Sequence, residues 1–477
     1  MQTADTQTAQ QQPAEPKSAG PQPGPRGRAH RATPWPEARG IAAQAAKGPL
    51  PTVVRELGDA LGQVLAAPLV ALTDLPSFDT SAMDGWALGG PGPWRIADPA
   101  GTGILAGHAE PAPLDDGEAA RIATGARIPS GTTAVLRSEY GEVRERAGGR
   151  GDWLHALPGR TVTPGQDIRP RGQECRSGDR LLPAGVLVTP AVLGLAAAAG
   201  YDELPTVPRP RVEILVLGDE LLRSGLPRDG RIRDALGPML GPWLRALGAE
   251  VIGTRHLRDE ADALHAAVTA STADLVLTTG GTASGPVDHV HPILRRAGAE
   301  LLVDGVAVRP GHPMLLARLA PGKHLVGLPG NPLAAVSGLL TLAEPLLRTL
   351  SGRMPAGRAP TATYPATASA TYPATASAAY PATAPATHPS AGSVAPLASA
   401  VQGHPHDTRL VPVAFSGVQA VPLHFNGPAM LRGIATADGL AVVPPGGAEA
   451  GTETEILEVP WYDDTGTAAR PDGGGRT

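Results

Sequence analysis

The residues best suited to chemistry lie in one short run, Asp74 to Ala87, which reads DLPSFDTSAMDGWA. Two carboxylates, Asp79 and Asp84, stand five residues apart around small side chains, with a proline before them and a glycine after. An ordinary polar loop that closes with an Asp-Gly turn has a similar composition. Acidic, small and chain-bending residues in so short a span also suit a loop beside an anionic ligand and a metal ion.

Two adjacent carboxylates, Asp219 and Glu220, follow Gly218 directly after the apolar run 212–217. At the end of a strand such carboxylates can hold a hard cation or a ribose hydroxyl, because both need oxygen partners. Acidic residues in the first turn of an ordinary helix give the same pattern. The position at a strand end favours a binding role.

A glycine pair, Gly280 and Gly281, follows the next buried run and is flanked by threonine hydroxyls. The backbone amides of such a turn can approach a phosphate closely. Asp288 lies seven residues beyond Gly281, close enough to place a carboxylate beside that phosphate and to hold Mg²⁺. The sequence therefore predicts a phosphate and metal site at this turn.

Three weaker motifs could also contact an anion. The amides and helix dipole at Gly330-Asn331-Pro332 would make an anion seat, although a Pro-Gly turn before a helix that starts with proline explains this motif equally well. Arg169 and Arg171 could contact phosphate in bidentate fashion, but an exposed salt-bridge cluster is the more frequent explanation. Thr124 adds a hydroxyl on a turn.

The histidines do not predict a zinc site. His289 and His291 form a His-x-His pair, and His312 follows later. Zinc needs three or four well-placed nitrogen or sulfur ligands, and the single cysteine, Cys175, is far away in the sequence. We interpret these histidines as surface residues or anion contacts.

Length and composition limit the number of domains and the classes of partner and compartment. A chain of 477 residues suggests about three domains. The net charge of -5 without a basic stripe argues against a nucleic-acid partner. The single cysteine excludes an internal disulfide and fits a reducing compartment. Residues 1–33 lack the apolar core of a signal peptide, and apolar stretches such as 186–199 are too short to span a bilayer. We expect a soluble, cytoplasmic protein without a membrane partner.

The pattern of apolar runs predicts a multidomain α/β plus β protein. In an N-terminal and linker region, 34–207, we expect helices over 34–46, 59–69 and 182–200, a strand at 53–54, and a β-rich insert over about 88–158. In 208–354 we expect strands over 212–217, 251–254, 275–278 and 324–328 that alternate with helices over 235–247, 261–269 and 333–350. This alternation predicts a parallel, doubly wound sheet with its ligand at the carboxyl ends of the strands.

The remaining segments differ in kind. An eight-residue period, TYPATASA, recurs with Tyr364, Tyr372, Tyr380 and His388 at one phase. Such units have little apolar bulk to bury, so we interpret 355–406 as a low-complexity linker. Residues 407–461 alternate short apolar runs with turns, as expected for a small β-barrel or sandwich. The ends, 1–33 and 462–477, are predicted to be disordered tails.

Seven motifs occur together in a recognisable order across about residues 34–461. They are SFDTSAMDG, ATGARIPSG around Thr124, IRPRGQE around Arg169, GDEL, TTGG with Asp288, RPGHP at Arg309 to Pro313, and GLPGNP. In this order the sequence resembles the MoeA/gephyrin E-domain family, whose members are molybdopterin molybdenumtransferases. The SFDTSAMDG run is the most specific of these matches.

The resemblance implies an elongated homodimer whose active cleft lies between the α/β domain of one subunit and the N-terminal region of the other. The implied reaction is Mg²⁺-dependent cleavage of adenylyl-molybdopterin, with insertion of molybdate and release of AMP. Implied catalytic residues are Asp79, Glu220, Asp259 and Asp288, with Glu220 and Asp288 as metal ligands. Implied substrate-binding residues are Thr124, Arg169, Asp219, Asp234, Gly280, Gly281, Arg309, His312, Gly330, Asn331 and Pro332.

The sequence departs from the family pattern at several of these positions. The lysines of the family's KPGKP-like motif stand here as Arg309 and His312, and the serine after its GNP-V motif stands as Ala334. A non-catalytic molybdopterin-binding or scaffold protein is therefore an alternative. A molybdopterin adenylyltransferase shares the α/β domain but lacks the SFDTSAMDG region, so it fits less well. That adenylyltransferase and molybdoenzymes are possible partners.

Overall fold

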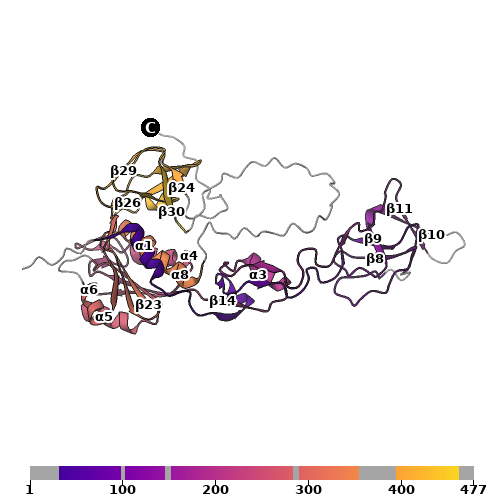
Figure 1. Ribbon diagram of the computed structural model, residues 1–477, viewed down its shortest axis with the longest axis horizontal. Coiled ribbons are helices and arrows are strands. Elements are labelled where there is room, and N and C mark those ends of the chain that lie inside the picture. Colours follow the sequence, from indigo (N-terminus) through magenta and orange to yellow (C-terminus); the bar gives the residue numbers. More distant parts are fainter. Residues whose placement is uncertain (1–31, 98–101, 146–151, 283–288, 354–393, 461–477) are drawn as a thin grey trace, which may run out of the picture.

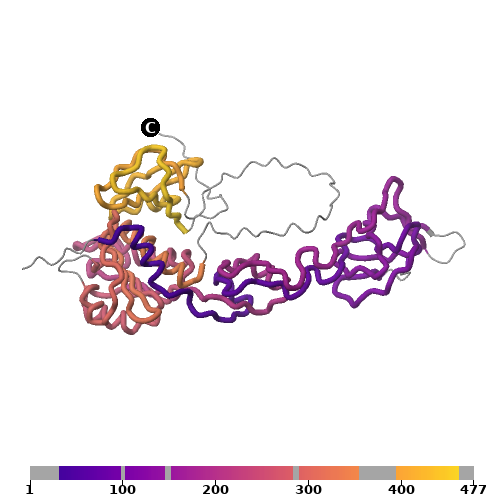
Figure 2. The backbone as a smooth tube through the Cα atoms, viewed as in Figure 1, coloured from indigo at the N-terminus to yellow at the C-terminus, as the bar shows by residue number. Residues whose placement is uncertain are grey.

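The computed structural model describes residues 32–97, 102–145, 152–282, 289–353 and 394–460. The molecule is elongated: an α/β domain and a C-terminal β domain lie together at one end, a small middle lobe follows, and a β-rich lobe forms the other end (Figure 1). In Figure 2 the chain starts beside the α/β domain, runs out through the middle lobe to the β-rich lobe, and returns by the same route. The segments that enter and leave the β-rich lobe therefore lie together.

The α/β domain is built on a six-stranded sheet. Its strand order is β18 (Glu250–Leu257), β15 (Arg211–Leu217), β19 (Leu275–Thr279), β23 (Lys323–Leu328), β22 (Leu315–Ala320) and β20 (Glu300–Asp304). The first four strands are mutually parallel, whereas β22 is antiparallel to both of its neighbours. The predicted fold class is confirmed, but the expectation of an all-parallel sheet was wrong at β22. Only the turn at Pro321 and Gly322 separates β22 from β23, and so short a connection permits only antiparallel pairing.

Helices cover both faces of this sheet. One face packs against α4 (Leu236–Ala246) and a continuous helical stretch made of α7 (Pro332–Gly338), a π-helical turn at Leu339–Ala343, and α8 (Glu344–Ser351). The other face packs against α5 (Ala261–Ala270) and α6 (Val290–Arg296). The doubly wound arrangement follows from the apolar character of the central parallel strands, β15, β19 and β23, which are buried on both sides.

The N-terminal helix α1 (Trp35–Gln44) also belongs to this core. It packs against α8 and the π-helical turn, and the Trp35 indole N–H donates a 3.0 Å hydrogen bond to the Thr341 hydroxyl. Helix α1 was predicted over 34–46, within the N-terminal region. The structure joins it instead to the α/β domain, because its buried face, Trp35, Ala38 and Ala42, completes that core.

The helical stretch Pro332–Ser351 is long and apolar enough to cross a membrane, with a mean hydropathy of 1.3 in its 18-residue window. In the described part of the chain it is the one helix that meets this test, and 83% of the window is buried inside the protein. Its apolar character is explained by its position in the centre of the α/β core.

The middle lobe contains β2 (Val53–Glu56), α2 (Leu57–Ala60), β3 (Val64–Leu65), β4 (Leu69–Val70), β13 (Arg180–Leu182), α3 (Pro190–Ala198) and β14 (Glu203–Val207). The helix predicted over 59–69 was wrong. Helix α2 stops after four residues, and Gly62 follows with a φ of +74° that breaks the helix. The helix expected over 182–200 is shorter than predicted, because Thr189 caps its start and Pro190 opens it.

The β-rich lobe is a six-stranded sheet with the order β10-β11-β7-β8-β6-β9. Its strands are β6 (Gly85–Gly89), β7 (Trp94–Ile96), β8 (Glu118–Ile122), β9 (Thr132–Arg137), β10 (Gly141–Glu145) and β11 (Asp152–Ala156). The lobe has its own small core around Trp86, Trp94 and Leu154. A β-rich insert at this place in the chain was correctly predicted.

The C-terminal β domain shares a sheet with the α/β domain. Strand β21 (Val306–Arg309) pairs with β1 (Thr33–Pro34) and with β26 (Thr408–Ser416), and β27 (Gln419–Pro422), β28 (Gly439–Val443), β30 (Glu453–Glu458) and β24 (Val394–Pro396) complete the sheet. A short ribbon pairs β25 (Val401–Gln402) with β29 (Gly447–Ala448). Because β24 and β25 pair inside this domain, ending the linker at 406 was wrong. Most of the repeat and of both predicted tails lies outside the described residues.

One buried histidine gives the α/β domain a pH-dependent stability. The imidazole of His324 is 1% exposed and contacts the Ala45 carbonyl oxygen through Nε2 at 3.2 Å, whereas Nδ1 has no hydrogen-bond partner in the described structure. Burial lowers the pKa of His324, so the folded state disfavours the imidazolium. An unfolded histidine titrates near pH 6.5. The stabilising contribution is therefore present above that pH and is lost as the pH falls towards the lowered folded pKa.

We predict that the free energy of unfolding of the natural chain falls faster between pH 7.5 and 5.5 than that of the His324→Gln variant. The difference in slope should approach about 1.4 kcal/mol per pH unit, the value for one proton. Urea unfolding followed by tryptophan fluorescence measures both profiles. His108→Gln, at an exposed position, serves as the control and should keep the natural slope. Parallel profiles for His324→Gln and the natural chain would contradict the prediction.

Candidate functional site

Three of the predicted motifs meet where the chain enters and leaves the β-rich lobe. Strand β5 (Thr80–Ser81) pairs with β12 (Ile168–Arg169), which brings the SFDTSAMDG run beside the IRPRGQE run. The Asp79 carboxylate accepts a 2.7 Å hydrogen bond from the Arg171 backbone N–H. The Asp79 carbonyl accepts another from Ile128 N–H, in the ATGARIPSG run. We call Asp79, Asp84, Thr124 and Arg169 the arm cluster.

The second aspartate of the run holds Thr124 in place. Asp84 accepts hydrogen bonds from the Thr124 backbone N–H at 2.7 Å and from the Thr124 hydroxyl at 2.9 Å. These two bonds lower the pKa of Asp84, so the carboxylate stays ionised. Sequence reasoning singled out Thr124 but gave Asp84 no role as its partner. The paired spacing of Asp79 and Asp84 was the available signal.

A third aspartate at the same place was missed. The Asp74 carboxylate accepts a 2.8 Å hydrogen bond from Ser177 N–H and forms an ion pair with Arg171. Both contacts, the backbone one first, lower the pKa of Asp74. Arg171 thus meets Asp79 with its backbone and Asp74 with its side chain. Asp74 opens the run that carries Asp79, but nothing in the local sequence identified its partner about one hundred residues away.

A second group of predicted residues lies at the carboxyl edge of the α/β sheet. Strand β15 leads to β18 on one side, and the chain then crosses to β19 on the other side. Ligands of such sheets bind where the strand order reverses in this way. The turns after β15 and β19 carry Asp219, Glu220, Gly280 and Gly281, so these predicted residues flank that reversal. We call these four residues, with Asp259 and Gly330, the sheet-edge cluster.

The acidic turn after β15 is joined to the turn after β18. The Asp219 backbone N–H donates to the Asp259 carboxylate at 3.3 Å. The Glu220 carboxylate lies over Gly218, where a Cβ atom would stand 2.6 Å from its Oε2. Glycine at this position therefore leaves room for Glu220 to fold back towards the strand end. The structure thus brings three predicted residues together: Asp219, Glu220 and Asp259.

The two glycine turns also lie against each other. Gly280 and Gly281 adopt φ values of +79° and +65°, which glycine tolerates best. Gly280 N–H donates to the Leu328 carbonyl at 2.9 Å. A Cβ atom at Gly330 would stand 3.7 Å from the Gly280 Cα atom. The backbone of the turn after β19 is therefore packed directly against the backbone of the turn after β23, as an anion-binding surface made of amides requires.

The start of helix α7 is already occupied by the protein itself. The N–H groups of Leu333 and Ala334 both donate to the Pro428 carbonyl oxygen, at 2.9 and 3.2 Å. Residue 332 is proline and has no N–H to offer. The anion seat predicted at this helix terminus is thus filled by a loop of the C-terminal domain. Gly330, Asn331 and Pro332 still border the sheet edge, but the helix amides do not point into free space.

Asp234 is engaged within the structure. Its side chain is buried, and its two carboxylate oxygens accept from Gly237 N–H at 2.9 Å and contact His256 Nε2 at 2.8 Å. Asp234 therefore anchors the start of helix α4 to strand β18. The resemblance implies a substrate contact at this position, and the structure shows a buried polar residue that joins α4 to β18.

The two predicted oxyanion residues lie at the boundary with the C-terminal domain. Arg309, at the end of β21, donates from Nε to the Asp407 carboxylate at 2.7 Å. The Arg309 side chain remains 51% exposed. His312 is placed by a 2.9 Å contact between its Nδ1 and the Val306 carbonyl oxygen. Both residues thus have a structural partner, and the Nε2 edge of His312 faces Gly305, where a Cβ would stand 3.9 Å away.

Of the two predicted metal ligands, Glu220 and Asp288, the structure describes only Glu220. Asp288 lies outside the described residues, and so the structure does not locate this predicted catalytic residue. His291 contacts the Asp304 carboxylate at 2.8 Å. Within the described ranges no group of three or more His, Cys, Asp or Glu side chains could hold a metal ion. The side chains of the sheet-edge cluster that could bind a cation, Asp219, Glu220 and Asp259, offer carboxylate oxygens. Mg²⁺ prefers this type of ligand, together with phosphate oxygens of a substrate.

Three family models match successive parts of the chain. Residues 33–200 match the MoeA N-terminal region (domain I and II), residues 213–349 a probable molybdopterin binding domain, and residues 394–459 the MoeA C-terminal region (domain IV). A Staphylococcus aureus protein named molybdopterin molybdenumtransferase is 32% identical over 64% of this chain and 73% of its own length. The chain belongs to the MoeA family.

A second relative supports this membership, and a solved structure shows the shared fold. A Mycobacterium tuberculosis protein named molybdopterin molybdenumtransferase 2 is 36% identical over 62% of this chain and 74% of its own length. The crystal structure of a MoeA protein from Pyrococcus horikoshii matches with a TM-score of 0.66 and 24% identity, over 90% of this chain and 99% of that one. The likeness shows a shared fold along nearly the whole MoeA chain. The family resemblance proposed from the motifs is confirmed.

We predict that Arg309 and Asp407 stabilise the contact between the two domains. Arg309→Ala and Asp407→Ala should each lower the free energy of unfolding. The loss in the double variant should be smaller than the sum by about 0.5–1 kcal/mol, the usual value for a partly exposed pair. Denaturant unfolding of all four proteins measures this coupling. Additive losses would show that the ion pair contributes no stability.

Proposed function

We propose that this chain is a molybdopterin molybdenumtransferase, which inserts molybdate into adenylyl-molybdopterin and releases AMP during molybdenum cofactor biosynthesis. The observation that carries the proposal is the convergence of Asp79, Thr124 and Arg169 in one cluster, on segments that are far apart in the sequence. The resemblance implies that an adenylyltransferase lacks the SFDTSAMDG region, which carries Asp79 in this cluster. The names of relatives at 32–36% identity support the same assignment.

The two clusters do not meet within one chain. The arm cluster adjoins the β-rich lobe, and the α/β domain lies at the other end of the molecule (Figure 1). Within the described ranges no hydrogen bond or ion pair joins them. A homodimer in which the arm of one subunit faces the sheet edge of the other would bring the clusters together. We therefore propose a homodimer with two equivalent clefts, since closed two-fold dimers are the commonest assemblies.

In this proposal the sheet edge binds the phosphate groups. The amides of Gly281 and Gly330 would receive the pyrophosphate, because the packed backbones of their turns can approach it closely. The Gly280 N–H is engaged by the Leu328 carbonyl, so Gly280 would contribute close backbone approach rather than a donor. Glu220 and Asp288 would hold Mg²⁺, which would supply positive charge against the charge that develops on the pyrophosphate during cleavage. Asp219 and Asp259 would fix the position of the acidic turn.

Arg309 and His312 would meet molybdate. Arg309 uses Nε for Asp407, which leaves its terminal nitrogens for an anion. Cytoplasmic localisation fits the single cysteine, and possible partners are the adenylyltransferase that supplies the substrate and the molybdoenzymes that accept the product. A scaffold protein would bind molybdopterin without turnover.

The direct test supplies purified full-length protein with adenylyl-molybdopterin, Mg²⁺ and molybdate, and measures AMP release. We expect catalytic release that depends on both Mg²⁺ and molybdate. Tight binding of molybdopterin without AMP release would favour the scaffold alternative. Release that continues after Mg²⁺ is chelated would contradict the role proposed for Glu220 and Asp288.

We predict that Asp79→Asn and Glu220→Gln each lower AMP release by about two orders of magnitude, the usual effect of removing a charged group from a catalytic site. Mixing the two inactive proteins should restore about a quarter of the natural activity, because half of randomly formed two-fold dimers are mixed and each holds one intact cleft. A mixture of Asp79→Asn with Asp84→Asn, both in the arm cluster, is the control and should stay inactive. No recovery in the first mixture would place each cleft within one chain.

A further inference from the structure

A basic hairpin with exposed apolar side chains projects beside the sheet-edge cluster. Its base consists of β16 (Leu221–Leu222) and β17 (Ile232–Arg233), which pair in parallel, and only its tip at 228–231 has the antiparallel pairing of a hairpin. Ile232 N–H donates to the Glu220 carbonyl at 2.9 Å, which fastens the base to the acidic turn, and Asp234 N–H donates to the Leu222 carbonyl at 3.0 Å. Four arginines lie on it, against one acid, Asp229. These arginines are Arg223, Arg228, Arg231 and Arg233. We call residues 223–233 the basic hairpin.

The tip of the basic hairpin is well formed. Arg228 and Arg231 exchange backbone hydrogen bonds of 3.3 and 2.9 Å around Asp229 and Gly230. The φ values of Asp229 and Gly230 are +51° and +73°, as in the two-residue turns that suit a hairpin. A tip fixed in this way presents its arginines in a defined arrangement.

The basic hairpin exposes apolar side chains as well as arginines. Leu226 is 84% exposed and Ile232 is 55% exposed. All four arginines are exposed, and in the described part of the chain none of them forms an ion pair with a carboxylate. Arginine together with exposed apolar side chains is characteristic of protein interfaces rather than of a site for a small anion alone.

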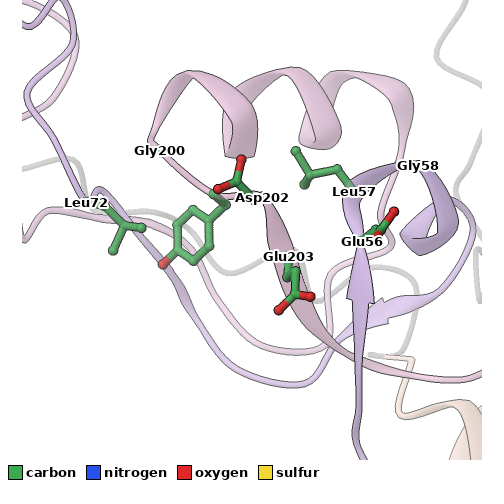
Figure 3. A pocket seen from close by; sticks show the side chains of 8 residues that line it. Glu56, Leu57, Gly58, Leu72, Gly200, Asp202 and Glu203 are labelled. Carbon is green, nitrogen blue, oxygen red and sulfur yellow. The ribbon is translucent and has the colours of Figure 1, made fainter.

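A surface of opposite character lies on the middle lobe. A hollow of about 710 Å³ is lined by Glu56, Leu57, Leu72, Tyr201, Asp202 and Glu203, with Gly58 and Gly200. Figure 3 shows the carboxylates of Glu56, Asp202 and Glu203 and the side chain of Leu72 around it. Leu72 is 56% exposed. We call these lining residues the acidic hollow.

Among the described residues that line the acidic hollow there is no lysine or arginine. Glu56 on β2 and Glu203 on β14 stand directly opposite each other in an antiparallel pair, and like charges in that position destabilise a sheet. Within the described ranges none of Glu56, Asp202 and Glu203 forms an ion pair. The neighbouring Arg55 pairs with Leu204 on the opposite face of the strands. A cation that enters the hollow from outside would relieve this repulsion.

We propose that the basic hairpin of one subunit docks in the acidic hollow of a second copy of this chain, with Leu226 against Leu72. Each chain carries both surfaces on different lobes, so a two-fold pair makes the contact twice and closes on itself. The pairing rests on the proposed homodimer, and it names the surfaces that set its register. Since Ile232 hydrogen-bonds the Glu220 backbone, docking also holds the acidic turn at the cleft.

Charge exchange tests the pairing in the full-length chain. The hairpin variant is Arg228→Glu with Arg231→Glu, and the hollow variant is Glu56→Arg with Glu203→Arg. Sedimentation velocity over a range of concentrations measures the dimer dissociation constant. Each variant should raise it by about tenfold or more, and their combination should return it to within about threefold of the natural value, because complementary charges are restored. Arg295→Glu with Arg296→Glu on α6 changes the same charges elsewhere and should have no effect. Thermal melting confirms that all variants are folded.

Several outcomes would overturn the pairing: a natural chain that stays monomeric, reversals that leave the dissociation constant unchanged, or losses that the combined variant does not repair. Unchanged self-association with weakened binding of inorganic pyrophosphate would assign the arginines to a ligand instead. AMP release by the same variants distinguishes the pairing from the proposed function. If the combined variant dimerises normally but releases no AMP, the transferase proposal is contradicted and the pairing stands. If AMP is released but the charge reversals do not change the dimer dissociation constant, the pairing is contradicted and the transferase proposal stands.

Discussion

The reversal of strand order at β15 is the constraint on which the α/β site depends. Since β18 and β19 lie on opposite sides of β15, the connections that follow these strands diverge at their carboxyl ends, which is where ligands of such sheets bind. The turn after β15 brings Glu220, and the turn after β19 brings the paired glycines. The basic hairpin grows from the first of these turns and returns to Asp234, whose buried carboxylate fixes the start of α4. One topological choice therefore places the acidic turn, the glycine turn and the hairpin together.

The C-terminal domain takes part in the same edge of the sheet. The Pro428 carbonyl caps α7, strand pairing joins β21 to β26, and Ile434, Leu440 and Leu457 extend the core of the α/β domain. A carbonyl at a helix start satisfies the free amides and opposes the positive end of the dipole. Any anion held near Gly330 therefore depends on the glycine amides and on side chains, since the helix has no free donor to add.

The sequence predicted elements well where one signal dominated. The buried runs of β15, β19 and β23 and the helix from Pro332 onward were recognisable because their apolar residues are continuous. The prediction failed where tertiary contacts decided the structure. Leu65 and Leu69 have helical spacing, yet they form short strands that pair with distant segments. The site shows the same division: Gly280 and Gly281 were evident from their turn, whereas the Asp74–Arg171 pair and the Pro428 cap join segments that no local pattern connects.

At the domain boundary, an arginine offers more hydrogen-bond donors than a lysine would. The chain has only three lysines, Lys17, Lys47 and Lys323, among 40 basic residues. A lysine at position 309 would offer one ammonium group, which an ion pair with Asp407 would hold. The Arg309 guanidinium spreads its donors over three nitrogens. Its Nε binds Asp407, and the two terminal nitrogens extend beyond that bond. An arginine at this position therefore holds the domain contact with one nitrogen and keeps two further nitrogens as hydrogen-bond donors.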